Sequence, residues 1–416
     1  MKNAKRTLAL LLALVMSLSL LAGCGDQNGN TSGGNTASDT PLVVGYAPFS
    51  SKFSPFFSET AYDQDVWVMT QLGLLTSDRT GAIIYKGIEG ETIDYNGTDY
   101  TYYGPADLEV TENADGTVYY DFTLRDDLKF SDGEPLTIDD VIFSMYVLCD
   151  PTYEGNSTLY AQPIEGMEAY RSGMSARQEL ILAAGPDGYT ANDYYTEDQY
   201  NTFWAAFNAA GVKFAQEILD YCVAAGANEE SDSVAAKAAN WGFSLADDAT
   251  VEDFWAAIVE KYGYDLSDDG INAEKASSSI SELLTAELGD RAGEFSAGVQ
   301  TGESAANISG IQKTGDYSMR IVMTKVDAVA IYQLGVTIAP MHYYGDKSLY
   351  DYDNNSFGFP KGDLSSVRAK TTQPMGAGPY KFIKFENGTV NFEANENYFQ
   401  GAPKTKYVNF LECISD

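Results

Sequence analysis

Histidine and cysteine are both scarce in this sequence, and their scarcity excludes several kinds of active site. The only histidine is His342, so a catalytic triad or a histidine-based metal centre would have to use that one residue. The four cysteines lie far apart, without the close spacing of a metal site. The Gly-x-Ser-x-Gly motif of a nucleophile elbow is also missing. The sequence therefore predicts no enzymatic activity, no bound metal and no cofactor.

Basic side chains are also few. The chain has 26 lysines and arginines against 60 aspartates and glutamates, which gives a formal net charge of −34. A field of this sign repels the phosphates of nucleic acids and anionic lipid surfaces, so we expect no nucleic-acid partner. The same excess of acid keeps an exported protein in solution, and it would also favour cationic ligands.

The N-terminus has the composition of an export signal. Basic residues come first, and an apolar segment of residues 8–21 follows, which is too short to span a bilayer with its flanks. The segment ends in Leu21-Ala22-Gly23-Cys24, which resembles the lipobox of bacterial lipoproteins. We predict a lipoprotein signal peptide over residues 1–24 and a lipid on Cys24. The lipid would anchor the protein outside the cytoplasm, at the outer face of the bacterial membrane or in the periplasmic space. An ordinary signal peptide with a chance cysteine is the alternative.

The sequence after the signal predicts a mixture of strands and helices. Residues 25–40 contain almost nothing apolar and should form a flexible tether. Residues 42–46 predict a buried strand, and residues 62–76 predict a helix. Asn96-Gly97 and Asp115-Gly116 predict the turns of two hairpins. Further predicted elements are a helix capped at Thr137 and strands at residues 318–323 and 378–383.

From residue 170 to residue 305 the sequence becomes alanine-rich, acidic and helical. Thr196 opens a capping box, and Thr250 caps another helix. Each amphipathic helix needs a partner for its apolar face. We therefore interpret residues 170–305 as an inserted, acidic helical subdomain.

Three blocks of sequence carry a resemblance to a known family. They are Phe122-Thr123-Leu124-Arg125 with Lys129-Phe130-Ser131-Asp132-Gly133 and Pro135-Leu136-Thr137-Ile138-Asp139-Asp140-Val141; Val326-Asp327-Ala328 with Ile338-Ala339-Pro340-Met341-His342-Tyr343; and Met375-Gly376-Ala377-Gly378-Pro379-Tyr380-Lys381 with Asn395-Glu396-Asn397-Tyr398-Phe399 and Gly401-Ala402-Pro403-Lys404. In this order they resemble the family 5 extracellular solute-binding proteins of ABC importers, the oligopeptide- and dipeptide-binding group. The resemblance covers roughly residues 41–165 and 306–412, with Glu396 and Phe399 in place of the family's usual proline and tryptophan.

The resemblance implies a mixed α/β fold similar to the type II periplasmic binding proteins, in which two lobes close on a ligand. The implied segments are lobe I with a subdomain over residues 41–169, its continuation over residues 306–375, and the crossover with the start of lobe II over residues 376–416. The implied hinge or crossover residues are Gly376, Gly378, Pro379 and Tyr380. Only about forty residues follow this block. We therefore expect the second lobe, with the acidic residue that captures a peptide's amino group, to be incomplete in this chain.

The implied function is capture of peptides outside the cell and their delivery to ABC permease subunits that work with a cytoplasmic ATPase. The loop after the first strand is the best ligand-binding candidate, because ligands settle at strand ends of α/β sheets. Its candidate residues are Ser50, Phe53, Ser54 and Phe56, with Trp67 on the following helix. Burial in the core is an equal alternative for Phe53 and Phe56 and the favoured one for Trp67. His342 is expected at a structural turn.

Two other functions stay open at this stage. A protein of the same class could bind an oligosaccharide or another non-peptide ligand. A surface adhesin or a secreted glycosidase would belong to a different class. Neither repeats nor a wall-anchor signal supports an adhesin, and paired carboxylates carry no signal in a chain with 60 acidic residues.

The Cys24→Ala variant should move the protein from the membrane fraction into the medium or periplasm, because it removes the predicted site of lipid attachment. Cell fractionation followed by quantification of the protein in each fraction measures this. A Cys413→Ala variant leaves the lipobox intact and serves as the control. Unchanged membrane association of the Cys24→Ala variant would argue against the anchor.

Overall fold

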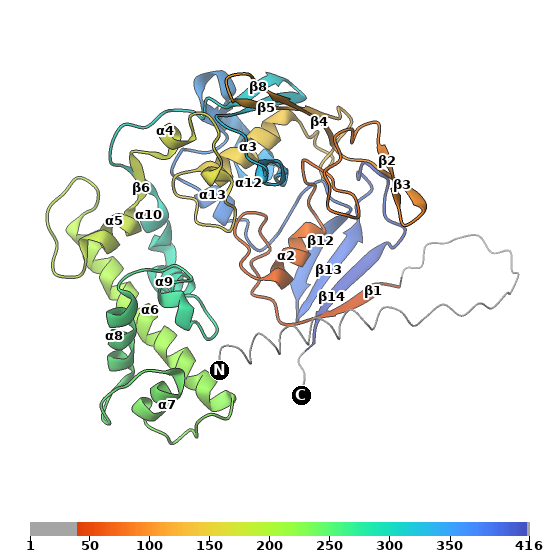
Figure 1. Cartoon of the computed structure of the whole chain (residues 1–416). Helices are drawn as coiled ribbons and strands as arrows, with labels where there is room; N and C mark the ends of the chain where they lie inside the picture. Colours follow the sequence, from red (N-terminus) through yellow and green to blue (C-terminus); the bar gives the residue numbers. More distant parts are fainter. Residues whose placement is uncertain (1–39, 414–416) are drawn as a thin grey trace, which may run out of the picture. The chain divides into compact units, whose positions relative to one another are not determined.

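The computed structural model describes residues 40–413, which form a mixed α/β fold (Figure 1). The predicted mixture of strands and helices is thereby confirmed. The predicted signal peptide, Cys24 and nearly all of the tether lie outside the described residues. Within residues 40–413, no helix has the length and apolar character to cross a membrane.

In the first of two four-stranded sheets in the described chain, the first strand pairs with the last strand. Its strands, in spatial order, are β1 (Leu42–Tyr46), β14 (Tyr407–Glu412), β13 (Thr389–Ala394) and β12 (Tyr380–Glu386). β1 runs parallel to β14, and the other neighbours are antiparallel. Helix α2 (Ala61–Val68) lies beside β12 and β13 (Figure 1). The buried core of this sheet consists of Phe53, Val66, Val390, Phe392, Val408 and Phe410.

Two predictions for this region need correction. The strand at residues 42–46 is present, but it is not buried: Leu42 and Val43 are 53% and 55% exposed, because β1 lies at the edge of its sheet. The helix predicted for residues 62–76 ends at Val68. The carbonyls of the next two residues accept hydrogen bonds from residues 378 and 380 instead of from a continuing helix.

Side chains of the second sheet belong to the largest hydrophobic cluster among the described residues. Its strands, in spatial order, are β4 (Ala106–Glu112), β5 (Val118–Leu124), β9 (Ser318–Met323) and β8 (Ile311–Gly315), all antiparallel. The predicted turn at Asp115-Gly116 and the predicted strand at residues 318–323 are both confirmed. The strand predicted for residues 378–383 begins two residues later, at Tyr380.

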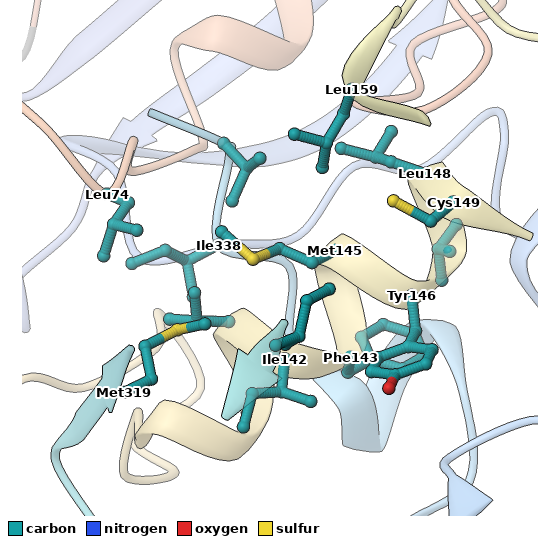
Figure 2. Packing of buried hydrophobic residues seen from close by; sticks show 14 of the residues in the cluster. Leu74, Ile142, Phe143, Met145, Tyr146, Leu148, Cys149, Leu159, Met319 and Ile338 are labelled. Atoms are coloured by element: carbon teal, nitrogen blue, oxygen red, sulfur yellow. The ribbon is translucent and has the colours of Figure 1, made fainter. Parts of the chain in front are cut away.

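Helix α3 (Ile138–Cys149) packs against this sheet and is buried almost all round. Figure 2 shows its side chains Ile142 and Met145 packed near Met319 of β9 and Ile338. A helix that is apolar on all sides belongs inside a protein, and α3 lies between the second sheet and the chain segments that cover it. The predicted cap is also confirmed, because Thr137 precedes α3 and its N–H donates to Asp140 Oδ2 (3.0 Å).

Shorter elements surround these two sheets. The predicted hairpin at Asn96-Gly97 is confirmed by β2 (Glu91–Tyr95) and β3 (Thr98–Tyr102), with positive φ angles of 54° and 79° at the two turn residues. The remaining short elements are η1 (Leu159–Ala161), α4 (Met167–Arg171), α11 (Ala330–Leu334), α12 (Met341–Tyr344), η4 (Lys347–Leu349), β10 (Tyr350–Asp351), η5 (Tyr352–Asn354), β11 (Ser356–Phe357) and α13 (Ser365–Arg368).

The acidic helical segment has a hydrophobic core of its own. Its elements are β6 (Met174–Ala176), α5 (Arg177–Ala184), α6 (Glu197–Ala224), α7 (Val234–Trp241), α8 (Val251–Tyr262), η2 (Ile271–Glu274), α9 (Ile280–Leu288), η3 (Gly289–Arg291), α10 (Ala292–Ser296) and β7 (Gly298–Gln300). The long helix α6 contacts α7, α8 and α9. The predicted caps at Thr196 and Thr250 are confirmed. The separate core supports the interpretation of a subdomain, and its boundaries stay a prediction.

Asp140 is the buried polar group that fixes the start of α3. Its Oδ2 accepts the Thr137 N–H and its Oδ1 accepts the Met341 N–H, both at 3.0 Å. Burial raises the pKa of Asp140 to about 6, although both hydrogen bonds favour the charged form. The carboxylate therefore ties α3 to a segment 201 residues further along the chain.

Asp140→Ala should lower the free energy of unfolding by roughly 2–4 kcal/mol, because two N–H groups lose their acceptor in a buried place. Chemical denaturation of both proteins measures the difference. Asp126→Ala, at an exposed position before α3 in the sequence, should change stability by less than roughly 0.5 kcal/mol. A similar effect of the two substitutions would contradict the role given to Asp140.

Candidate functional site

A hollow of about 680 Å³ lies beside strand β12. Six separate stretches of the sequence line it. The lining residues are Ser51, Phe53, Thr70, Ser131, Asp132, Tyr343, Thr372, Gln373, Pro374, Met375, Lys381, Phe382, Ile383, Lys384 and Phe385. Its size suits a small-molecule or short-peptide ligand.

The three sequence blocks meet at one wall of this hollow. The Ser131 N–H donates to the Gly376 carbonyl (2.9 Å). Asp132 Oδ2 lies 2.7 Å from His342 Nε2, and Asn397 Nδ2 lies 3.4 Å from the Ser131 carbonyl. We call these five residues the motif junction. The blocks that carry the family resemblance are thus in direct contact, although up to 266 residues separate them.

The glycines of the third block are required by close packing. The Gly378 N–H donates to the Thr70 carbonyl (2.8 Å), so the two backbones run side by side. A Cβ atom on Gly376 or Gly378 would lie well under 3.0 Å from backbone atoms of Thr70 or Gln71. Only glycine allows this approach without a shift of the backbone.

Pro379 and Tyr380 are held from the opposite side. Asn395 is completely buried, and its Nδ2 donates to the Gly378 carbonyl (2.8 Å) while its N–H donates to the Pro379 carbonyl (2.8 Å). The Tyr380 hydroxyl donates to the Thr405 carbonyl (3.0 Å). Residues 376–380 are therefore fixed in place as they enter β12, and their role as a hinge or crossover stays a prediction.

The walls of the hollow combine aromatic rings with groups of both charges. The Phe53 ring meets the Phe385 ring edge-on, with centroids 5.5 Å apart. Burial raises the pKa of Asp132, but the hydrogen bonds from His342 and from the Glu134 N–H outweigh it and hold that pKa below its usual value. Asp132 is therefore negatively charged near neutral pH. Lys381 supplies positive charge on β12.

The residues predicted to bind ligand separate into different environments. Phe53 lines the 680 Å³ hollow, and its side chain is otherwise enclosed in the core. Ser50 bonds to Asp63 through its N–H (3.1 Å) and its hydroxyl. The Ser54 hydroxyl is buried and accepts the N–H groups of Phe56 and Phe57 (3.2 Å each).

Phe56 and Trp67 line another hollow, of about 310 Å³. The Phe56 side chain is only 3% exposed, and Trp67 Nε1 donates to Ser58 Oγ (2.8 Å). Of the five candidates, the structure thus brings only Phe53 to the main hollow. Sequence reasoning missed residues 381–385, and their one signal was the strand that follows the Gly-x-Gly-Pro-Tyr motif.

Comparison with known proteins decides the family. The model of the bacterial extracellular solute-binding proteins, family 5 (middle), matches residues 102–228 and 243–413. The chain belongs to this family. The match includes most of the helical segment and leaves out residues 229–242 between its two stretches. Because this is a family of solute-binding proteins, the prediction of a non-enzymatic protein is confirmed.

Individual relatives of this family 5 protein are distant. Oligopeptide-binding protein AppA of Bacillus subtilis is 25% identical over 114 residues, which are 27% of this chain and 19% of AppA. Dipeptide-binding protein DppE of the same organism is 32% identical over 68 residues, or 16% of this chain and 12% of DppE. The matched stretches thus span less than a fifth of these relatives' length.

Solved structures show a similarly partial correspondence. The structure of AppA from Bacillus subtilis in complex with a nonapeptide aligns with a TM-score of 0.42 and 16% identity, over 90% of this chain and 40% of that chain. The complex of Haemophilus influenzae OppA with RPPGFSPFR aligns with a TM-score of 0.37 and 14% identity, over 91% of this chain and 43% of that chain.

Gly378→Ala should destabilise the protein by roughly 1–3 kcal/mol, because the added methyl group overpacks the contact with Thr70 and Gln71. Thermal and chemical denaturation measure the loss. Gly293→Ala is the matched control: its Cβ meets nothing within 4 Å in helix α10, so the same substitution should be neutral or stabilising. Equal stability of wild type and Gly378→Ala would show that the backbone contact is looser than described.

Proposed function

We propose that this family 5 protein is the substrate-binding component of an ABC transporter. It captures peptides outside the cell and delivers them to membrane permease subunits that work with a cytoplasmic ATPase. The observation that carries the proposal is the exposure of one strand edge: five consecutive residues of β12, 381–385, line the 680 Å³ hollow.

Strand β12 is suited to main-chain recognition of a peptide. In the described chain it pairs only with β13, so its other edge has no partner strand. The register shifts between Phe382 and Lys384, which leaves Ile383 unpaired and 52% exposed at the hollow. An extended peptide can bind such an edge through its backbone, and that mode tolerates many side chains.

Charge in the hollow also fits a peptide. A peptide carries a positive and a negative end, and the hollow offers Asp132 on one wall and Lys381 and Lys384 on another. Lys384 already pairs with Glu386, which leaves Lys381 as the better partner for a carboxylate. The partly exposed ring of Phe385, which packs against the buried ring of Phe53, adds apolar surface for side chains.

We further propose the two-lobe arrangement of the type II periplasmic binding proteins. Residues 376–380 would lie at the crossover, and a second lobe would close over the hollow when ligand is bound. The permease would then distinguish the closed form from the open one. A lipid on Cys24 would hold the protein at the outer face of the membrane.

Membership of a solute-binding family favours transport over the adhesin and glycosidase alternatives. An oligosaccharide or another non-peptide ligand belongs to the same class, and Tyr343 at the hollow is a ring on which a sugar could stack. Titration with peptides and with oligosaccharides distinguishes these two ligand classes.

Calorimetric titration of the full-length protein with di- to octapeptides should detect binding, and Ile383→Asp should weaken it at least about tenfold, or roughly 1.4 kcal/mol. The added carboxylate places an unfavourable charge on the proposed binding edge. Val326→Asp is the matched control, because Val326 is similarly exposed (58%) and does not line the hollow. It should bind peptide as the wild type does.

Two outcomes would count against the proposal. If no peptide gives heat and oligosaccharides do, the ligand is an oligosaccharide and not a peptide. Equal peptide affinity of the Ile383→Asp and Val326→Asp variants would show that the peptide does not bind at the edge of β12.

A further inference from the structure

Asp132 reaches the 680 Å³ hollow from a wall that does not belong to β12. Its Oδ2 lies 2.7 Å from His342 Nε2, and its Oδ1 accepts the Glu134 N–H at 3.1 Å. Each oxygen of a carboxylate can accept a second hydrogen bond. The Asp132 side chain is still 39% exposed. The carboxylate is therefore oriented by two neighbours and remains accessible to a donor in the hollow.

His342 is more enclosed than the carboxylate that it contacts. Its side chain is 18% exposed, and its ring meets the buried ring of Phe130 edge-on, with centroids 5.4 Å apart. Because the Asp132 carboxylate is charged and can only accept, Nε2 of His342 carries the hydrogen of their bond. This bond fixes the direction of the carboxylate from a packed support.

The charges at the hollow differ from one wall to another. Asp132 is the only acidic side chain among the described residues that line it. The two basic side chains in the lining, Lys381 and Lys384, both lie on β12, and Lys384 pairs with Glu386. A cationic group of a ligand is thus attracted to Asp132 and repelled by Lys381, so the charges orient a ligand across the hollow.

We propose that Asp132 determines the specificity of the hollow by selecting peptides with a lysine or arginine side chain, and that His342 is its positioning residue. This inference rests on the peptide-binding function proposed above. A peptide bonded to β12 through its main chain leaves its side chains free to reach the other walls. An ammonium or guanidinium group then donates to the Asp132 carboxylate, and such charge-assisted hydrogen bonds are stronger than neutral ones.

Calorimetric titration of the full-length protein with the tripeptides Ala-Lys-Ala and Ala-norleucine-Ala tests this selection. Norleucine keeps the four-carbon chain of lysine and lacks only the ammonium group, and both peptides have the same two ends. The wild type should bind the lysine peptide at least about tenfold more tightly. Asp132→Asn keeps the size of the side chain and removes its charge, so it should reduce this preference to less than about threefold.

Two further comparisons separate a local effect of Asp132 from other causes. Asp126→Asn removes an exposed acid that does not line the hollow, and it should keep the preference of the wild type. His342→Ala should lower the preference at least about threefold, whereas His342→Gln supplies an amide donor and should restore most of it. A merely structural role of His342 would weaken both peptides alike and leave their ratio unchanged. Melting temperatures show whether each variant is folded.

The outcomes distinguish this inference from the function on which it rests. Equal affinity of the wild type for the two tripeptides would overturn the selection by Asp132 and leave peptide binding in place. A full lysine preference in a folded Asp132→Asn variant would also overturn it. If no di- to octapeptide binds at all, the proposed function fails, and the inference fails with it.

Discussion

The hydrogen bond from the Ser131 N–H to the Gly376 carbonyl lies at the point where the two sheets of the protein are joined. Ser131 follows β5 of the second sheet, and Gly376 leads into β12 of the first. Asp132 and His342 bond beside it, and Asp140 ties the start of α3 to Met341. These contacts are polar: the Asp140–Met341 bond is buried, whereas the Asp132–His342 bond is exposed. The hollow beside β12 exists because this junction sets the distance between the two sheets.

The helical segment stands in a different relation to the sheets. It holds 24 acidic and 7 basic side chains and is organised around its own core. One ion pair that links it to the remaining chain is Lys52–Glu282, which is partly exposed. Such pairs contribute little free energy individually.

Local sequence signals predicted the elements that depend on neighbouring residues. The turn at Asn96-Gly97 and the caps at Thr137, Thr196 and Thr250 need only nearby atoms, and all are present. The early end of α2 and the exposure of β1 depend on strands that lie more than 300 residues away.

The candidate site shows the same division between local and distant information. Aromatic and hydroxyl residues predicted an open loop at residues 50–56, but their hydrogen bonds and packing place most of them in the core. The edge of β12 could not be identified from sequence, since it is defined by the absence of a neighbouring strand.

Hydrogen–deuterium exchange of the full-length protein with and without a saturating peptide tests the location of the solute most directly. Amides of residues 381–385 and of residues 372, 373 and 375 should exchange more slowly when peptide is bound. Slower exchange elsewhere, such as in the hollow at residues 160–172, with residues 381–385 unchanged, would contradict the placement of the solute beside β12.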